Sequence, residues 1–230
     1  MPENLKLCIA SWKKFLPDYE IKLWDFNRFP KGKSEWVDEA FAQKKYAFAS
    51  DYIRCYALYT EGGIYLDSDV EVLKSFDPLL SKPYFLGLDS MNHIEAAVMG
   101  FEKGNDIFKN ALDFYDSHSF SSFNNLDSIT MPQILEKIIT KGRSIKSVLS
   151  PDNLSNDNDY FSILPYTFFS PKSMKTGKIE SNDDTFTIHH FEGSWYPLWK
   201  KYCKALLLKI GGRKLINIIK RISFSNSISK

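Results

Sequence analysis

The stretch Tyr46–Leu73, YAFASDYIRCYALYTEGGIYLDSDVEVL, decides how this chain of 230 residues folds. Its first part, Ala47–Thr60, has few polar side chains, and a helix that is apolar nearly all round is buried. Gly62-Gly63 follows where glycine commonly ends a helix. The apolar and aromatic residues of Ile64–Leu66 then predict a central strand. A buried helix, a glycine turn and a strand therefore follow one another directly.

Asp67 and Asp69 stand one residue apart where that strand should end. In open α/β sheets, ligands bind beyond the carboxyl ends of strands, and two carboxylates there can share a hard divalent cation with phosphate oxygens. The alternative is an acidic turn without a ligand. Two other aspartate motifs do not fit. A calcium-binding EF-hand loop would need Gly and Glu where Val72 and Pro78 stand, and an aspartyl-phosphate phosphatase would need Thr or Val in place of Glu71.

Two charged residues of the buried helix, Asp51 and Arg54, are three positions apart and share one face. Buried charges are costly unless they are paired or bound to something charged. The pair therefore has two interpretations, a ligand-binding role or a structural ion pair, and we favour the first. Tyr65, just before the aspartates, could line a pocket or equally be a core tyrosine.

The segment ASDYIRCYALYTEGGIYLDSDVEVL resembles the sugar-binding region of the DXD glycosyltransferases of the initiation-specific mannosyltransferase and capsular polysaccharide type, and the clostridial glucosylating toxins share this pattern. A bare DxD is common, but DxD after a strand, after Gly-Gly and after SDxxR in a buried helix is a specific combination. The resemblance covers most of residues 4–200. It implies an α/β fold of the nucleotide-diphospho-sugar transferase (GT-A) type over residues 1–200, with a mixed, mostly parallel sheet flanked by helices.

The same resemblance implies transfer of a hexosyl unit from a nucleotide-sugar to a glycan or lipid-linked glycan, with retention of configuration, in bacterial surface polysaccharide synthesis. Asp67 and Asp69 would bind Mn2+ or Mg2+ and the donor diphosphate. Asp51 would accept hydrogen bonds from sugar hydroxyls, Arg54 would support the sugar or the diphosphate, and Tyr65 would contact the donor. Asp51, Arg54 and Asp69 are the implied catalytic residues, and no nucleophile is assigned. A UDP-sugar is the first expected donor and GDP-mannose the second.

A second motif, IHHFEGSW at residues 188–195, resembles the C-terminal HHxxxSW motif of this family. The resemblance implies that a histidine completes the metal site, with His190 slightly preferred over His189. It also implies that Ser194 and Trp195 contact the diphosphate as a loop closes.

The beginning of the chain departs from the family pattern. Members usually begin with a strand that helps hold the nucleotide base, whereas this chain starts directly at a helix, and Met1-Pro2-Glu3 would fit an internal position. We expect a truncated chain or a start codon assigned too late. This departure motivates a second hypothesis, a catalytically silent or truncated relative that binds a glycan or nucleotide-sugar.

Composition sets the wider bounds. The three cysteines form no CxxC pattern, which indicates a reducing compartment, and neither a signal peptide nor a run of about 20 apolar residues is present, so we expect a cytoplasmic protein.

The net charge is +2, yet nine basic residues and no acidic one follow Glu192. Residues 201–230 are expected to form a basic amphipathic helical tail. It would either dock on anionic lipid at the inner face of the plasma membrane or pack with its lysines solvated. No nucleic-acid motif accompanies the charge, so no nucleic-acid partner is expected.

Helical periodicity, capping residues and apolar alternation predict the remaining elements. The expected helices are 3–16, 34–42, 105–115 and 131–140, the last with a Thr130–Gln133 capping box. The expected strands are 20–24, 84–88, 94–100, 160–164 and 185–190. Asp89, His93 and Glu95 follow the 84–88 strand, and a solvated loop is favoured over a contact with the acceptor.

Overall fold

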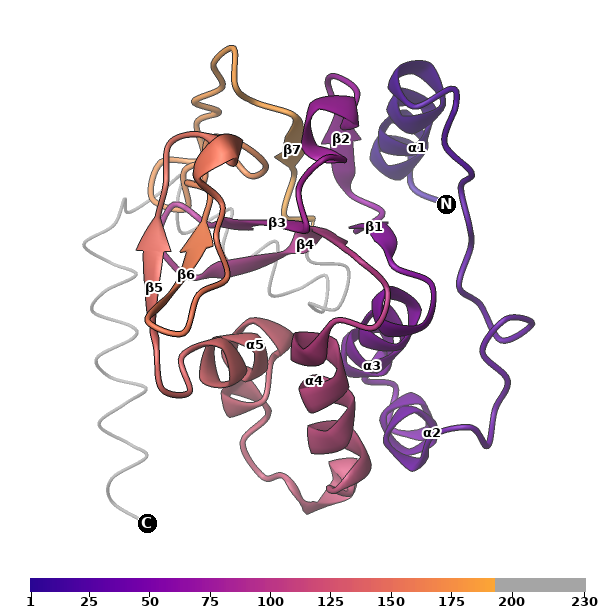
Figure 1. Ribbon diagram of the computed structural model, residues 1–230. Helices are drawn as coiled ribbons and strands as arrows, with labels where there is room; N and C mark the ends of the chain where they lie inside the picture. The colour runs from indigo at the N-terminus through magenta and orange to yellow at the C-terminus, as the bar shows by residue number, and fades with distance from the viewer. Residues whose placement is uncertain (193–230) are drawn as a thin grey trace, which may run out of the picture. The chain divides into compact units, whose positions relative to one another are not determined.

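A three-stranded antiparallel sheet in the order β1-β4-β3 lies in the middle of the structure (Figure 1). Its strands are β1 (Gly63–Leu66), β3 (Tyr84–Leu88) and β4 (Ile94–Phe101). The structure is a computed structural model, and it describes residues 1–192. Strands β3 and β4 form a hairpin, closed by a hydrogen bond from the Asp89 amide to the His93 carbonyl (2.8 Å). A link this short forces the two strands to run antiparallel.

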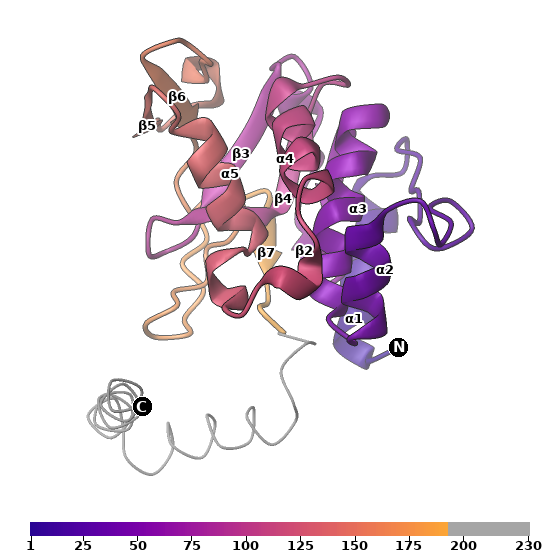
Figure 2. The ribbon, with the colours of Figure 1, turned by 90° about the horizontal axis from the view of Figure 1, so that it is seen from below.

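Four helices cover one face of this sheet, as Figures 1 and 2 show from two sides. They are α2 (Glu35–Ala42), α3 (Tyr46–Thr60), α4 (Asp106–Asp116) and α5 (Met131–Ile139). Along β3 the side chains alternate, so Tyr84, Leu86 and Leu88 pack with the helices in one apolar cluster, while Phe85 packs in another. The Asn105 side chain begins α4 by accepting the Ile107 amide, as expected.

The opposite face is covered by α1 (Glu3–Phe15) and by a second sheet of β2 (Val70–Val72) and β7 (Thr187–His189). The indole of Trp12 donates to the Val70 carbonyl (2.6 Å), which fixes α1 against β2. A third sheet pairs β5 (Ser144–Ser147) with β6 (Tyr160–Ile163) in parallel. The segment Asp67–Asp69 is therefore the point at which the chain leaves the first sheet for the second.

A bulge in β4 lies beside that crossing. Leu86 pairs with Met99, but the next residue, Gly87, pairs with Glu95, so the three β4 residues between have no partner on β3. Bulges of this kind bend a strand and re-aim its side chains. Here the carbonyl of Ala97 accepts the Asp67 amide (2.8 Å), so the bulge anchors the aspartate turn.

The predicted α/β class and the helix-turn-strand order of residues 46–66 are confirmed. The predicted mostly parallel sheet is wrong for residues 1–192. Both β1-β4-β3 and β2-β7 are antiparallel, and the parallel pairing in this part of the chain is that of β5 with β6 and a bridge between Gly87 and Leu164. Strand β1 is not central, because within residues 1–192 it pairs with β4 alone.

Three local predictions also differ from the structure. Residues 20–24 form no strand: Ile21 and Leu23 are exposed, and Lys22 forms an ion pair with Glu61 (2.8 Å). Strand β5 was not predicted, because its sequence Ser-Ile-Lys-Ser has one apolar residue. Helix α5 begins after Thr130, but that side chain makes no capping hydrogen bond.

Met1–Phe191 forms one compact unit. None of the helices within residues 1–192 combines the length and apolar character needed to cross a bilayer. Ser194, Trp195, the predicted division at residue 200 and the basic tail 201–230 lie outside the described residues, so these stay predictions.

The close approach of β3 to β4 yields a stability prediction. Gly100 pairs with Phe85 across the strands, and a Cβ atom at Gly100 would lie 2.1 Å from Cε1 of the Phe85 ring. Phe85 is buried and stacked on Phe76, so its ring has little room to move. Gly100→Ala should lower the free energy of unfolding by about 1–3 kcal/mol in urea denaturation.

Phe85→Leu removes the two ring atoms nearest to that Cβ position, Cε1 and Cζ, and supplies the control. The double variant should lose less stability than the sum of the two single losses, because the closest contacts of the clash are absent from it. An unchanged urea midpoint for Gly100→Ala would contradict the packing described.

Candidate active site

Arg54 of α3 contacts both Asp51 of the same helix and Asp67 of the DxD turn. Its Nη2 lies 3.2 Å from Asp67 Oδ1 and 3.3 Å from Asp51 Oδ1, and its Nη1 donates to the Ala96 carbonyl in the β4 bulge (3.1 Å). The guanidinium also lies over the Tyr65 ring, 4.6 Å from its centroid. The helical ion pair with Asp51 is therefore present, and the same planar group extends it to the DxD turn.

Tyr65 faces the site rather than the core alone. Its hydroxyl donates to Asp67 Oδ1 over 2.5 Å. Arg54 and Tyr65 both reach the same carboxylate oxygen, so the second oxygen of Asp67 can serve as a ligand for a cation. The helix and β1 thus hold Asp67 in one orientation.

His189, at the end of β7, lies beside the two aspartates of the DxD turn. Its Nε2 lies 3.4 Å from Asp69 Oδ1, and Asp67, Asp69 and His189 each offer one ligand atom within 4.8 Å of the others. Two carboxylate oxygens and an imidazole nitrogen suit Mn2+ and Mg2+, and the nitrogen favours Mn2+ of the two. These three residues fit a divalent cation.

His190, the preferred histidine in the sequence analysis, faces elsewhere: its Nε2 lies 2.9 Å from Glu71 Oε2. The pairing of β2 with β7 explains the difference. Val70 is opposite His189 and Glu71 is opposite Ile188, so alternation puts His189 on the face of buried Val70 and His190 on the face of Glu71. The geometry therefore favours His189 as the metal ligand, and the assignment stays a prediction.

Glu95 is a site residue that the sequence analysis placed in a solvated loop. It lies in β4, is 8% exposed, and its Oε2 is 3.4 Å from His189 Nδ1. The signal was a single carboxylate within the otherwise apolar run Ile94–Met99. Asp89 and His93 do belong to the hairpin turn, where Asp89 Oδ1 accepts the His93 amide (3.0 Å).

Within residues 1–192, four carboxylates of this site form ion pairs with Arg54 or His189: Asp51, Asp67, Asp69 and Glu95. Burial raises the pKa of Asp51 to about 6, against the lowering effect of Arg54, and burial raises the pKa of Asp67 as well. A site in which carboxylates resist ionisation gains from a bound cation.

For His189 burial acts in the opposite direction and would lower the pKa. The nearby carboxylates of Asp69 and Glu95 outweigh burial and raise the pKa of His189 to about 10. The imidazole therefore neutralises part of the acidic charge in the absence of a metal ion.

Comparison with known proteins agrees with this chemistry. Residues 2–86 match the family described as "Glycosyltransferase sugar-binding region containing DXD motif". The matched region contains Asp51, Arg54, Tyr65 and both aspartates of the DxD turn. This part of the chain is therefore similar to the sugar-binding region of DXD glycosyltransferases.

Among curated proteins, the chain is 30% identical over 185 residues to mannosyl phosphorylinositol ceramide synthase SUR1 of Saccharomyces cerevisiae, a match that covers 74% of this chain and 46% of the relative. It is 37% identical over 92 residues to inositol phosphoceramide mannosyltransferase 3 of Schizosaccharomyces pombe, covering 38% of this chain and 26% of that protein. The chain spans less than half the length of these relatives. Both are fungal proteins, and neither name refers to capsular polysaccharide.

Among solved structures, the chain is similar to one named "PaToxG Glycosyltransferase". The TM-score is 0.47 at 21% sequence identity, over 60% of this chain and 63% of that one.

The burial of Asp51 predicts a pH-dependent stability difference. The folded protein holds the Asp51 proton more tightly than the unfolded chain, so this residue costs stability as the pH rises from the ordinary aspartate value to about 6. Asp51→Asn removes that cost. Between about pH 4 and pH 7 the free energy of unfolding of the variant should rise relative to wild type by about 2 kcal/mol.

Urea denaturation of both proteins at the two pH values measures this change. A difference between variant and wild type that is the same at both pH values would show that Asp51 does not titrate as a buried carboxyl.

Proposed function

We propose that this protein is a divalent-cation-dependent mannosyltransferase that moves a mannosyl unit from a nucleotide-sugar to a hydroxyl of a lipid-linked acceptor. The observation that carries the proposal is the joined cluster of Asp67, Asp69 and His189, tied through Arg54 to Asp51. The names of the fungal relatives support mannose as the sugar and a phosphoinositol ceramide as the class of acceptor. They favour such an acceptor over the surface polysaccharide that the sequence resemblance suggests.

Asp67, Asp69 and His189 would hold the cation, which supplies positive charge against the diphosphate that leaves the sugar. Arg54 keeps Asp67 oriented from within the fold, because its guanidinium is fixed by Asp51, by the Ala96 carbonyl and by the Tyr65 ring. Asp51 is 8% exposed and would accept hydrogen bonds from donor-sugar hydroxyls. The residues of the chain thus bind and orient the donor.

Two donors, which differ in their nucleotide base, are candidates. GDP-mannose is the donor we would test first, since the relatives are named for mannosyl transfer, and UDP-sugars are the second. Retention of configuration, a GT-A arrangement and a place at the inner face of the membrane remain parts of the proposal that rest on the sequence resemblance.

A thermal-shift measurement tests the cation site. GDP or UDP with Mn2+ should raise the melting temperature, by about 2–4 °C for each kcal/mol of binding free energy in a domain of this size, and either compound without Mn2+ should raise it less. Asp69→Asn should abolish the Mn2+-dependent part, because one carboxylate ligand is lost.

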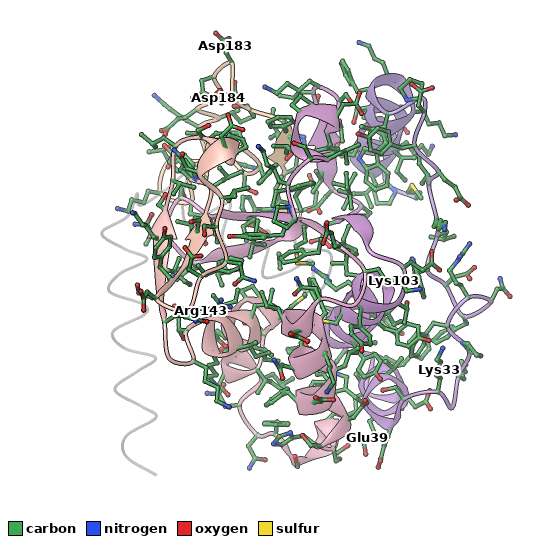
Figure 3. All side chains as sticks on the ribbon, in the orientation of Figure 1. Lys33, Glu39, Lys103, Arg143, Asp183 and Asp184 are labelled. Carbon is green, nitrogen blue, oxygen red and sulfur yellow. The ribbon has the colours of Figure 1, made fainter. Side chains whose placement is uncertain are left out.

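Asp184→Asn is the matched control, since Asp184 is exposed and lies with Asp183 in the outer loop before β7 (Figure 3). It should behave as wild type. A Mn2+-dependent shift that survives in Asp69→Asn would contradict the proposal.

Turnover separates the proposed enzyme from a silent binding relative. With Mn2+, the protein should release GDP from GDP-mannose slowly in water and faster when a phosphoinositol ceramide is added, because the acceptor hydroxyl replaces water. Release is measured by a coupled assay for GDP. Binding of nucleotide diphosphates without turnover of any donor would favour the silent relative.

A further inference from the structure

A second carboxylate lies behind the proposed cation ligands. Glu95 is 8% exposed and His189 is 6% exposed, so both side chains are withdrawn from solvent. The two ring nitrogens of His189 face different carboxylates: Nε2 is 3.4 Å from Asp69 and Nδ1 is 3.4 Å from Glu95. Asp69 belongs to the DxD turn, whereas Glu95 is separated from that turn by the imidazole ring.

Glu95 is itself fixed by the fold. Its Oε1 accepts the Ala97 amide (3.0 Å), which the β4 bulge frees from pairing with β3. Its other oxygen, Oε2, is the one directed at His189. Removing the bulge would turn this side chain to a different position, so the bulge and the carboxylate act as one unit.

Nδ1 of His189 is buried and, within residues 1–192, has no partner that meets hydrogen-bond geometry. A buried polar nitrogen without a partner is costly, and Glu95 Oε2 is the acceptor in its direction. Histidines that bind metals with one nitrogen generally donate the other N–H to a carboxylate or carbonyl, which fixes the tautomer and the ring orientation.

We infer that Glu95 is a positioning residue that holds the His189 imidazole with Nδ1–H toward Glu95 and Nε2 toward Asp69. The inference rests on the proposed function, because it assigns the carboxylate that orients one ligand of the proposed cation site. Glu95 touches neither the sugar nor the diphosphate in this account. It determines which nitrogen the site presents.

The alternative is a purely structural role, in which Glu95 only satisfies the Ala97 amide. Glu95→Gln separates the two roles, because it keeps the volume but offers a single acceptor oxygen. Ala97 and His189 face different oxygens of Glu95, and the single amide oxygen of Gln can occupy only one of those two positions, so either the amide or the ring loses its acceptor. The matched control is Glu102→Gln, an exposed glutamate directly after the same strand.

The first measurement is Mn2+ affinity, followed by the electron paramagnetic resonance signal of free Mn2+ in titrations of each purified protein. Glu95→Gln should bind Mn2+ about 10- to 100-fold more weakly than wild type, as for other carboxylates behind metal-bound histidines. Glu102→Gln should bind as wild type does. A structural role alone would lower the melting temperature of Glu95→Gln and leave the Mn2+ affinity of the folded protein unchanged.

The second measurement needs no variant. Nitrogen-15 NMR of the wild-type protein saturated with the diamagnetic ion Mg2+, with the ring signals assigned by triple-resonance experiments, should show a hydrogen on Nδ1 of His189 and none on Nε2, because a nitrogen that binds a metal carries no hydrogen. A bare Nδ1 would overturn the inference even if Glu95→Gln fails to fold.

The outcomes distinguish the inference from the proposed function. If wild type binds Mn2+, Asp69→Asn does not, and Glu95→Gln binds as tightly as wild type, the role of Glu95 is overturned and the proposed function stands. If wild type itself binds no Mn2+, both are overturned.

Discussion

The site depends on one buried interaction, the guanidinium of Arg54 between Asp51 and Asp67. A carboxylate loses hydration free energy when it is buried, and an ion pair offsets part of that loss. Removing one partner of the pair leaves a buried charge without compensation. Arg54 therefore does more than neutralise a neighbour on its own helix. It connects α3 to the turn between β1 and β2 and, through the Ala96 carbonyl, to the β4 bulge. Elements that are distant in sequence are held at the positions that the cation ligands need.

The charge balance around this arginine gives the site its chemistry. Arg54 and His189 face four carboxylates, and burial raises the pKa of two of them, Asp51 and Asp67. A divalent cation bound between Asp67, Asp69 and His189 would add positive charge beside these carboxylates and would leave coordination positions for phosphate oxygens. The folded chain therefore holds an acidic cluster that could bind a divalent cation together with a diphosphate.

Much of this arrangement could be predicted from the sequence, because it depends on local pattern. The mostly apolar residues 47–60, the two glycines and the paired aspartates follow one another closely, and their order predicts the helix, the turn and the acidic crossing. Arg54 and Asp51 could be placed on one helix face for the same reason.

The rest depends on pairing between distant segments. His190 and Glu71 are 119 positions apart, and whether His189 or His190 faces the aspartates is fixed by the register of β2 against β7. A slip of one residue would exchange the two histidines. The place of Glu95 in the site could not be predicted for a related reason. A bulge shifts the register of β4 against β3, and no residue pattern in Ile94–Phe101 indicates that bulge. The mostly parallel sheet was predicted from the family resemblance. The short turn from Asp89 to His93 instead makes β3 and β4 antiparallel.

Anomalous diffraction from crystals soaked with Mn2+ and a nucleotide diphosphate would test the central claim most directly. The account predicts an anomalous peak within coordination distance of carboxylate oxygens of Asp67 and Asp69 and of Nε2 of His189, with diphosphate oxygens on its open side. A peak at another place in the molecule, or density that shows Asp67 and Asp69 turned into solvent with the ion absent, would contradict it.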